Sequence, residues 1–318
     1  MKLISAFFRL VRWPNLVFIA LTQLLFYFCI IIPSLPENYF QQPGSLNPSI
    51  LYILVAASVL IAAAGYIIND YFDINIDLIN KPAKMVVQKI IKRRWAIFFH
   101  LVITFTGLAL SALVAFKTSF IIIAGNFVCA LLLWVYSTTF KKKLLSGNII
   151  ISALTAWTVM VLYFATNNTV TATSTLPSDI AAGMHRIYKF AALYAGFAFI
   201  ISLIREVVKD IEDKEGDTRY NCRTMPIVWG VPASKVFVGV WLVVLAGSLL
   251  IVQFYVIQIG WWMSGLYVLL FVIIPLVWIL KKFYVAQTNK QYHQISIAVK
   301  LVMLTGICSM IFIKLYAQ

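Results

Sequence analysis

Residues 67–77 read IINDYFDINID and directly follow the mostly apolar stretch 48–66. Three aspartates, Asp70, Asp73 and Asp77, therefore stand at the end of a segment long enough to cross a membrane, since about 20 apolar residues span a hydrocarbon core of roughly 30 Å. The apolar stretch predicts a transmembrane helix. The carboxylates at its end require a separate explanation.

The composition of the whole chain supports a membrane protein. Its 318 residues are 62% hydrophobic and only 12% charged, and the mean hydropathy of +0.91 lies far outside the range of soluble domains. We predict an all-α polytopic membrane protein, a bundle of nine transmembrane helices. The predicted spans cover residues 15–33, 48–69, 95–116, 118–137, 148–166, 187–208, 235–257, 262–280 and 295–316.

The basic residues predict the orientation of these spans. Cytoplasmic loops carry an excess of Lys and Arg, and a cytoplasmic N-terminus places nearly all basic residues outside the spans on the cytoplasmic side. We therefore interpret the net charge of +15 as membrane topology and attraction to anionic headgroups or phosphorylated substrates, with no nucleic acid as partner. The four Cys and three His residues are scattered, which gives no disulfide, zinc or triad pattern.

The acidic residues fall mainly into two clusters, after the second and the sixth predicted span, and both clusters are predicted to be cytoplasmic. If the helix continues beyond the membrane, Asn69, Asp73 and Asp77 share one helical face. In KDIEDKEGD (209–217), the spacing of Asp210, Asp213 and Asp217 gives a second such face. The plainer alternative is that both clusters are solvated helix ends or form salt bridges with nearby Lys and Arg.

Carboxylates this close repel one another unless a cation lies among them. Oxygen ligands without His or Cys suit Mg²⁺, which is commonly shared between carboxylates and substrate phosphates. A substrate with a diphosphate head and an apolar tail would place its head at such metals. Two metal sites could hold the diphosphate from opposite sides and act as Lewis acids for C–O cleavage. An acceptor held close by, away from water, would then capture the allylic cation.

Several motifs resemble the UbiA superfamily of intramembrane prenyltransferases. NDYFDINID followed by NKP, and REVVKDIEDKEGD followed by RTMPI, are similar to its two signature motifs. RWPN (12–15) resembles its N-terminal motif, and YSTTFKKKLLSGN (136–148) resembles its Tyr-Ser segment. The resemblance implies one prenyltransferase domain over residues 1–318, with two Asp-rich cytoplasmic loops over a central cavity that faces the cytoplasm.

The resemblance also implies roles for individual residues. It places the first metal and diphosphate site at Asn69, Asp73 and Asp77, and the second at Asp213 and Asp217 with Asp210 as an added ligand. Asp73, Asp77, Asp213 and Asp217 would be the catalytic carboxylates. The candidate diphosphate-binding residues are Lys84, Lys141 and Lys209, and the candidate acceptor-binding residues are Arg12, Asn15, Tyr136 and Arg223. Lys84 and Lys209 could instead hold a phosphate of the acceptor, together with Arg223.

Within this superfamily, the sequence of the second motif most resembles that of the digeranylgeranylglyceryl phosphate synthase branch. This implies Mg²⁺-dependent transfer of a geranylgeranyl-like group from an isoprenyl diphosphate to the hydroxyl of a prenylated glycerol phosphate. An alcohol is a poor acceptor, and Asp70 or Asp210 could serve as its base. The alternatives are an aromatic-acceptor polyprenyltransferase of quinone biosynthesis, of the 4-hydroxybenzoate type, and a cation transporter. A transporter is disfavoured because no Asp or Glu lies within the middle of a span.

Two further expectations concern the loop after the second span and the chain as a whole. After NKP the family usually has Arg-Pro and then Ser-Gly, whereas this chain reads AKMVVQK with Lys84 at the arginine position, so we expect a differently shaped loop. Acid clusters follow spans two and six, and Lys runs follow spans four and eight. Spans two to five are therefore predicted to repeat in spans six to nine.

Overall fold

The computed structural model describes residues 2–80, 82, 85–167 and 178–316. Within these ranges the chain is helical, with one isolated β-bridge between Val87 and Ile91, so the all-α prediction is confirmed. The described residues also contain nine helical segments long and apolar enough to cross a membrane, which is the predicted number. They are Trp13–Ser34, Pro48–Phe72, Arg93–Lys117, Ile121–Thr138, Ser146–Thr166, Asp179–Glu212, Gly230–Gln258, Trp262–Val285 and Asn289–Tyr316.

The chain forms two compact units. The first comprises residues 1–140 and 157–192, and the second comprises residues 141–156 and 193–318. Two of the boundaries fall within α8 (Ser146–Thr166) and α9 (Ser178–Glu212), so both of these helices contribute to both units. The first aspartate cluster belongs to the first unit, and the second cluster belongs to the second unit.

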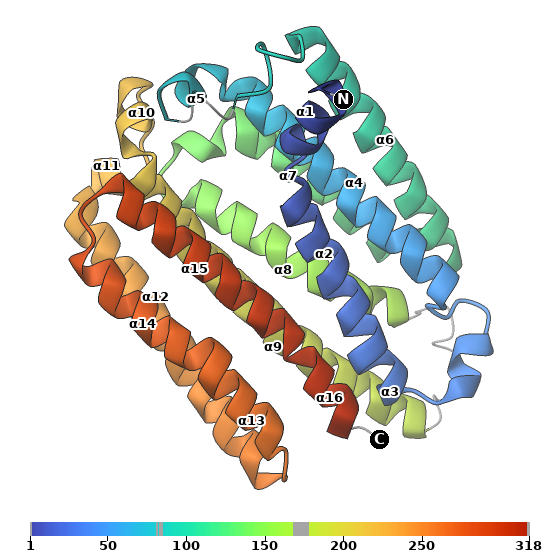
Figure 1. Ribbon diagram of the computed structural model, residues 1–318. Helices are drawn as coiled ribbons and strands as arrows, with labels where there is room; N and C mark the ends of the chain where they lie inside the picture. Colours follow the sequence, from blue (N-terminus) through green and yellow to red (C-terminus); the bar gives the residue numbers. More distant parts are fainter. Residues whose placement is uncertain (1, 81, 83–84, 168–177, 317–318) are drawn as a thin grey trace. The chain divides into compact units, whose positions relative to one another are not determined.

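The first unit is built around α4 (Pro48–Phe72), which packs against α2, α6 and α7 (Figure 1). Close approach is possible where small residues face larger ones: a Cβ on Gly65 would lie 2.8 Å from Leu133, and a Cβ on Gly107 would lie 2.9 Å from Ile61. The other helical segments with bounds inside this unit are α1 (Lys2–Leu10), α2 (Trp13–Phe26), η1 (Tyr27–Ile31), α3 (Ile32–Ser34), η2 (Glu37–Gln41), α5 (Ile74–Asn80), α6 (Arg93–Lys117) and α7 (Ile121–Thr138).

A buried polar network joins three helices of the first unit. Asn126 of α7 donates to Ser111 of α6 at 2.8 Å, and Trp157 of α8 donates its ring N–H to Asn126 Oδ1 at 2.9 Å. Polar side chains within lipid need such internal partners. The network therefore fixes the register of these helices.

The second unit packs around the C-terminal half of α9. Its core includes Val207 of α9, Leu242 of α12, Leu276 of α14 and Val299 of α15, all at most 1% exposed. η3 (Phe140–Lys142) lies at the unit boundary. The remaining segments of the second unit are α10 (Lys214–Arg219), α11 (Met225–Val228), α12 (Gly230–Gln258), α13 (Trp262–Val268), η5 (Leu269–Ile273), α14 (Ile274–Val285), α15 (Asn289–Cys308) and α16 (Met310–Tyr316).

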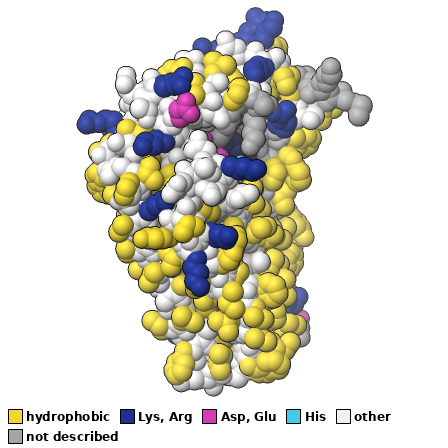
Figure 2. Space-filling model, turned by 60° about the vertical axis from the view of Figure 1, so that its left-hand side comes forward, with side chains coloured by type: hydrophobic (Ala, Val, Ile, Leu, Met, Phe, Trp, Pro, Cys, Tyr) yellow, Lys and Arg dark blue, Asp and Glu magenta, His cyan; other side chains and the backbone are white. Residues whose placement is uncertain are grey.

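The outer surfaces of the spans are apolar. Phe116 is 89% exposed, Ile251 75% and Phe254 69%, which is the arrangement expected for side chains that face lipid tails. Figure 2 shows hydrophobic side chains over most of the lower part of one face, with Lys and Arg gathered above them. These surfaces and the nine apolar helices identify a multi-pass integral membrane protein.

Candidate metal and diphosphate site

The first aspartate cluster lies at a break in a helix. α4 ends at Phe72, Asp73 follows with φ −87° and ψ 0°, and α5 begins at Ile74. The N–H of Asp73 donates to Asn69 O at 3.0 Å, and the N–H of Asp77 donates to Asp73 O at 2.8 Å. Because both helical hydrogen bonds persist, Asn69, Asp73 and Asp77 keep the predicted four-residue spacing across the break.

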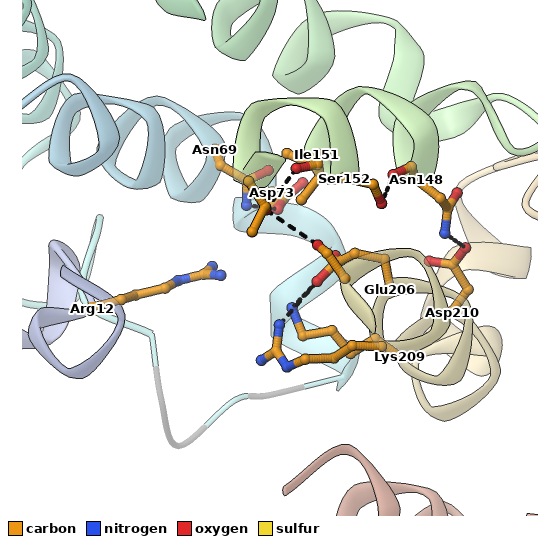
Figure 3. Close-up of polar contacts among 12 residues, drawn as sticks. Arg12, Asn69, Asp73, Asn148, Ile151, Ser152, Glu206, Lys209 and Asp210 are labelled. Carbon is orange, nitrogen blue, oxygen red and sulfur yellow. Dashed lines mark hydrogen bonds and ion pairs between the residues drawn. The ribbon is translucent and has the colours of Figure 1, made fainter. Parts of the chain in front are cut away.

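Asn69 orients the central carboxylate of this cluster. Its Nδ2 donates to Asp73 Oδ2 at 2.7 Å (Figure 3), and Asp73 is only 4% exposed. Asn69 Oδ1 is buried and accepts no hydrogen bond from any residue that the structure describes. A buried acceptor without a donor is uncommon, and a hard cation would satisfy this oxygen.

Arg12 belongs to the same cluster through Asp70. It caps the start of α2 in the left-handed region, at φ 51°, and its Nη2 lies 2.6 Å from Asp70 Oδ1. Its guanidinium also lies 5.2 Å from the centroid of the Tyr66 ring. Burial alone would lower the pKa of Arg12, but the charges of Asp70 and its neighbours outweigh burial and raise the pKa. The structure thus places Arg12 in an ion pair with the first aspartate of the motif.

The second cluster repeats the backbone break of the first. α9 ends at Glu212, Asp213 follows with φ −91° and ψ 4°, and α10 begins at Lys214. The N–H of Asp213 donates to Lys209 O at 2.8 Å, and the N–H of Asp217 donates to Asp213 O at 3.2 Å. The most enclosed carboxylate here is Asp217, at 7% exposure, whereas Asp213 is half-buried.

Asp210 is held by a residue from another helix. Asn148, in the first turn of α8, donates its Nδ2 to Asp210 Oδ2 at 2.8 Å (Figure 3). Lys141 interacts electrostatically with the same carboxylate. The backbone N–H of Arg223 donates to Lys142 O at 2.8 Å, which ties the Lys run to the segment after α10. Tertiary structure therefore brings Lys141 and Asp210 into one polar cluster.

Glu206 forms a further ion-paired group one turn earlier on α9. It accepts from Arg205 Nη1 at 3.0 Å and from Lys209 Nζ at 3.2 Å. Lys209, a predicted phosphate ligand, thus lies against a carboxylate. Sequence reasoning assigned no role to Asn148, Arg205 or Glu206. The one signal for Asn148 was its position at the end of the Tyr-Ser segment, and the signal for Glu206 was its place in the second acid cluster.

The other predicted site residues lie on different segments of the chain. Tyr136 lies near the end of α7 and Asn15 in the first turn of α2, both half-buried, while the side chain of Arg223 is exposed. Asp77 is half-buried on α5. Lys84 lies outside the described residues, as does much of the altered NKPAK loop.

The oxygen atoms of the two aspartate clusters are of the kind that binds a hard divalent cation. Within the described ranges, no three His, Cys, Asp or Glu side chains converge closely enough to ligate one metal. Each cluster instead offers carboxylate oxygens, and the first adds the unsatisfied Asn69 oxygen. Mg²⁺ commonly takes one or two protein carboxylates and completes its octahedron with waters and substrate phosphates. Clusters of this kind suit that partial, substrate-dependent coordination.

Comparisons with known proteins indicate the same family that the sequence motifs resemble. A family model described as the UbiA prenyltransferase family matches residues 15–302. Digeranylgeranylglyceryl phosphate synthase of Thermococcus gammatolerans is 35% identical over 192 residues, which are 59% of this chain and 60% of the relative. The protein of that name from Methanosphaera stadtmanae is 25% identical over 260 residues, 81% of this chain and 85% of the relative. The chain spans about three fifths of the length of the first curated relatives it matches.

Solved structures share the fold. One from work on digeranylgeranylglyceryl phosphate synthase in membranes has a TM-score of 0.59 at 23% identity and covers 98% of this chain and 99% of its own. A UbiA homologue from Archaeoglobus fulgidus, solved with DMAPP and Mg²⁺, has a TM-score of 0.56 at 15% identity and covers 96% of this chain and 98% of its own. At these identities the likeness establishes the fold.

Proposed function

Because the chain belongs to the UbiA prenyltransferase family, we propose that it transfers a geranylgeranyl-like group from an isoprenyl diphosphate to the hydroxyl of a prenylated glycerol phosphate. The products are an ether lipid and diphosphate. The observation that carries the proposal is the pair of aspartate clusters, each set at a helix break where oxygen donors are clustered. The acceptor follows from the curated relatives, which are named digeranylgeranylglyceryl phosphate synthase; this favours a glycerol phosphate over the aromatic alternative.

The proposed metal ligands are the oxygens of the two clusters. Asn69, Asp73 and Asp77 would hold one Mg²⁺, and Asp213 and Asp217 would hold another, which leaves Asp210, the added ligand that the resemblance implies, for the proton transfer below. When bound, Mg²⁺ supplies Lewis-acid stabilisation of the leaving diphosphate. Asn69 contributes in a second way, because its amide donation fixes the rotamer of Asp73. We propose Lys141 as a cation that supports the diphosphate, because it already acts on Asp210.

The acceptor hydroxyl must lose a proton as the ether bond forms. Asp70 is already held by the charged guanidinium of Arg12, whereas the donor to Asp210 is the neutral amide of Asn148. We therefore propose Asp210 as the carboxylate that accepts this proton, with Asn148 holding it in place. Arg12 then acts as a positioning residue for the first motif, not as a direct ligand of the acceptor.

Orientation in the membrane is also a proposal. The basic residues outside the spans favour a cytoplasmic N-terminus and a cytoplasmic active site. The aspartate clusters would then meet soluble Mg²⁺ and the diphosphate head at the membrane surface, while the apolar tail of the substrate lies among the helices.

The proposal is tested by a product assay with purified, reconstituted protein. Geranylgeranyl diphosphate and MgCl₂ are combined with either geranylgeranylglyceryl phosphate or 4-hydroxybenzoate, and products are identified by mass spectrometry. We expect the ether product with the first acceptor, and its loss when EDTA removes the metal. Ring alkylation without ether product, or full activity in EDTA, would overturn the proposal.

A further inference from the structure

A hydrogen bond joins the end of α9 to the start of α15. His293 Nδ1 lies 2.8 Å from Glu212 Oε1, across 81 residues of sequence. A carboxylate oxygen only accepts hydrogen bonds, so the Nδ1–H group of His293 is the donor. Glu212 is the last residue of α9 and directly precedes Asp213. The contact therefore holds the residue beside a proposed metal ligand.

The carboxylate of Glu212 depends on this one contact. Its side chain is 15% exposed, against 47% for the side chain of His293, so the protein shields most of it from water. Among the residues that the structure describes, His293 is its only hydrogen-bonding partner. A shielded carboxylate without a donor is unfavourable. His293 therefore fixes the direction in which the Glu212 side chain points.

The start of α15 is a firm support for His293. Thr288 and Gln291 form a capping box there, in which each side chain bonds to the backbone of the other residue, and such a box keeps the first turn of a helix ordered. Tyr292, at 3% exposure, donates its hydroxyl to Ala286 O at 2.9 Å. The residues on either side of the first turn are thus tied to the end of α14, and His293 has little freedom to follow Glu212 if α9 moves.

The packing beneath the contact sets the spacing of the two helices. Ile211 of α9 and Tyr292 and Ile295 of α15 belong to one buried core, each at most 4% exposed, and Figure 1 shows α15 lying along α9. Ile211 and Tyr292 directly precede Glu212 and His293 in the sequence. The hydrogen bond therefore continues the core contact by one residue on each helix, up to the break at Asp213.

A cavity lies directly beyond this contact. It has a volume of about 560 Å³ and separates α10 from the segment that leads into α15. A cavity gives the helices around it no packing atoms, so α10 gains little support from α15 on this side. Its walls include Lys214, Thr218 and Arg219 of α10, together with Gln287, Asn289 and Tyr292.

The hydrogen bonds of the break itself are local. Asp213 N–H donates to Lys209 O at 2.8 Å, and Asp217 N–H donates to Asp213 O at 3.2 Å. Both bonds fix the conformation of the chain within the break, but neither fixes its direction relative to α15. That direction depends on where the last residue of α9 is held.

We propose that His293 is a positioning residue for the second metal site: by holding Glu212, it sets the direction in which Asp213 presents its carboxylate to the cation. This rests on the proposed function, which supplies the metal site. Mg²⁺ requires near-ideal octahedral geometry, and loss of a group that orients a metal ligand costs about 10-fold to 100-fold in metal affinity. His293 differs from Asn69 because it acts from another helix and through a neighbouring residue.

Metal binding is the first readout, and it does not depend on turnover. The whole chain in nanodiscs is titrated with Mn²⁺, which takes the same oxygen ligands as Mg²⁺, in the presence of a thiolodiphosphate analogue of geranylgeranyl diphosphate that is not cleaved. Electron paramagnetic resonance measures free and bound Mn²⁺. We expect His293→Leu to weaken Mn²⁺ binding at one of the two sites by about 10-fold. His293→Asn keeps an N–H donor near the position of Nδ1 and should restore most of the affinity.

The matched control is His185→Leu, because His185 is an exposed histidine near the other end of α9; it should bind Mn²⁺ like the wild type. Glu212→Ala should reproduce the loss seen in His293→Leu. The double variant should be no worse than either single variant, since both changes remove the same contact. His293→Phe replaces His293→Leu if that variant does not fold.

Kinetics supply the second readout. In His293→Leu, the Mg²⁺ concentration for half-maximal activity should rise by about 10-fold, while kcat at saturating Mg²⁺ stays close to that of the wild type. A merely structural role would instead lower the melting temperature and the yield of folded protein without a change in metal affinity. His293→Asn should have the metal requirement of the wild type.

The possible failures can be told apart. If the wild type makes ether product and binds Mn²⁺, but His293→Leu binds Mn²⁺ with wild-type affinity, this inference is wrong and the proposed function stands. Equal losses in His293→Leu and His293→Asn would also overturn the inference, since the donated hydrogen bond would then be irrelevant. If the wild type makes no ether product and binds no Mn²⁺, both the inference and the proposed function are wrong.

Discussion

Asp73 and Asp213, which lie in different units of the chain, occupy the same kind of helix break with nearly the same backbone conformation. Their φ and ψ angles are −87° and 0° for Asp73 and −91° and 4° for Asp213. Each is preceded by an aspartate three residues earlier and followed by one four residues later. The shared local structure is what the predicted repeat of spans two to five in spans six to nine would produce, and we retain that repeat as a proposal.

Loss of either central carboxylate should abolish most activity. Asp73→Asn and Asp213→Asn each remove one negative charge with almost no change in size. We expect kcat to fall by about 100-fold or more, as when one electrostatic group at a reacting centre is lost. Initial rates of ether formation at saturating Mg²⁺ measure this. Asp179→Asn, an exposed carboxylate at the other end of α9, is the control and should keep wild-type activity; wild-type rates in Asp73→Asn would contradict the assignment.

Asn69 should affect the metal requirement more than the fold. Asn69→Leu removes both the unsatisfied oxygen and the donor to Asp73. We expect the Mg²⁺ concentration for half-maximal activity to rise by about 10-fold or more, the usual effect of losing a residue that orients a metal ligand. Asn69→Asp keeps an oxygen, so its Mg²⁺ concentration for half-maximal activity should lie between those of Asn69→Leu and the wild type. Identical Mg²⁺ titration curves for Asn69→Leu and the wild type would remove Asn69 from the site.

The Arg12–Asp70 ion pair should be detectable in a double-mutant cycle. Arg12→Met and Asp70→Asn each leave a partly buried partner without its counter-charge, and the double variant should recover part of the loss. Because the side chains are 35% and 18% exposed, solvent weakens the pair, and we expect a coupling free energy of about 1 kcal/mol. Reversible unfolding in mixed micelles measures it. Strictly additive effects would show that the contact contributes nothing to stability.

Asn148 should matter for catalysis because it holds Asp210. Asn148→Leu removes the 2.8 Å donation to Asp210 and leaves a carboxylate beside an apolar side chain. We expect kcat to fall by about 10-fold to 100-fold, with KM for the prenyl diphosphate less affected. Ser152→Ala is the matched control one turn away, since Ser152 donates to the backbone oxygen of its own helix. A larger effect in Ser152→Ala than in Asn148→Leu would contradict this role.

Membrane orientation can be tested by cysteine labelling. Lys142→Cys and Gln287→Cys place thiols at exposed positions between spans that are predicted to lie on the cytoplasmic side, and Gln42→Cys places one in the predicted loop on the opposite side. In intact cells, a membrane-impermeant maleimide should label Gln42→Cys alone. After the cells are opened, it should label all three. Labelling of Lys142→Cys in intact cells would reverse the proposed orientation. The wild type supplies the background from its four native cysteines.

The number and type of the spans could be predicted from the sequence because both follow from local composition. A run of apolar residues long enough to cross the membrane is a helix wherever it lies, and the nine predicted spans all have counterparts among the described residues. Their ends were less predictable. α9 reaches Glu212 although its last turns carry Arg205, Glu206 and Lys209, because core contacts and ion pairs hold those turns helical beyond the purely apolar run.

The sequence by itself determined the fold class, the two aspartate clusters and their spacing, because helical periodicity alone fixes which residues of one segment share a face. Only tertiary structure decided which partners these residues have. Arg12 reaches Asp70, and Asn148 reaches Asp210. Each pair is far apart in the chain, and nothing in its local sequence specifies the contact. It arises because burying the apolar faces of the helices brings these polar side chains together, where they must satisfy one another.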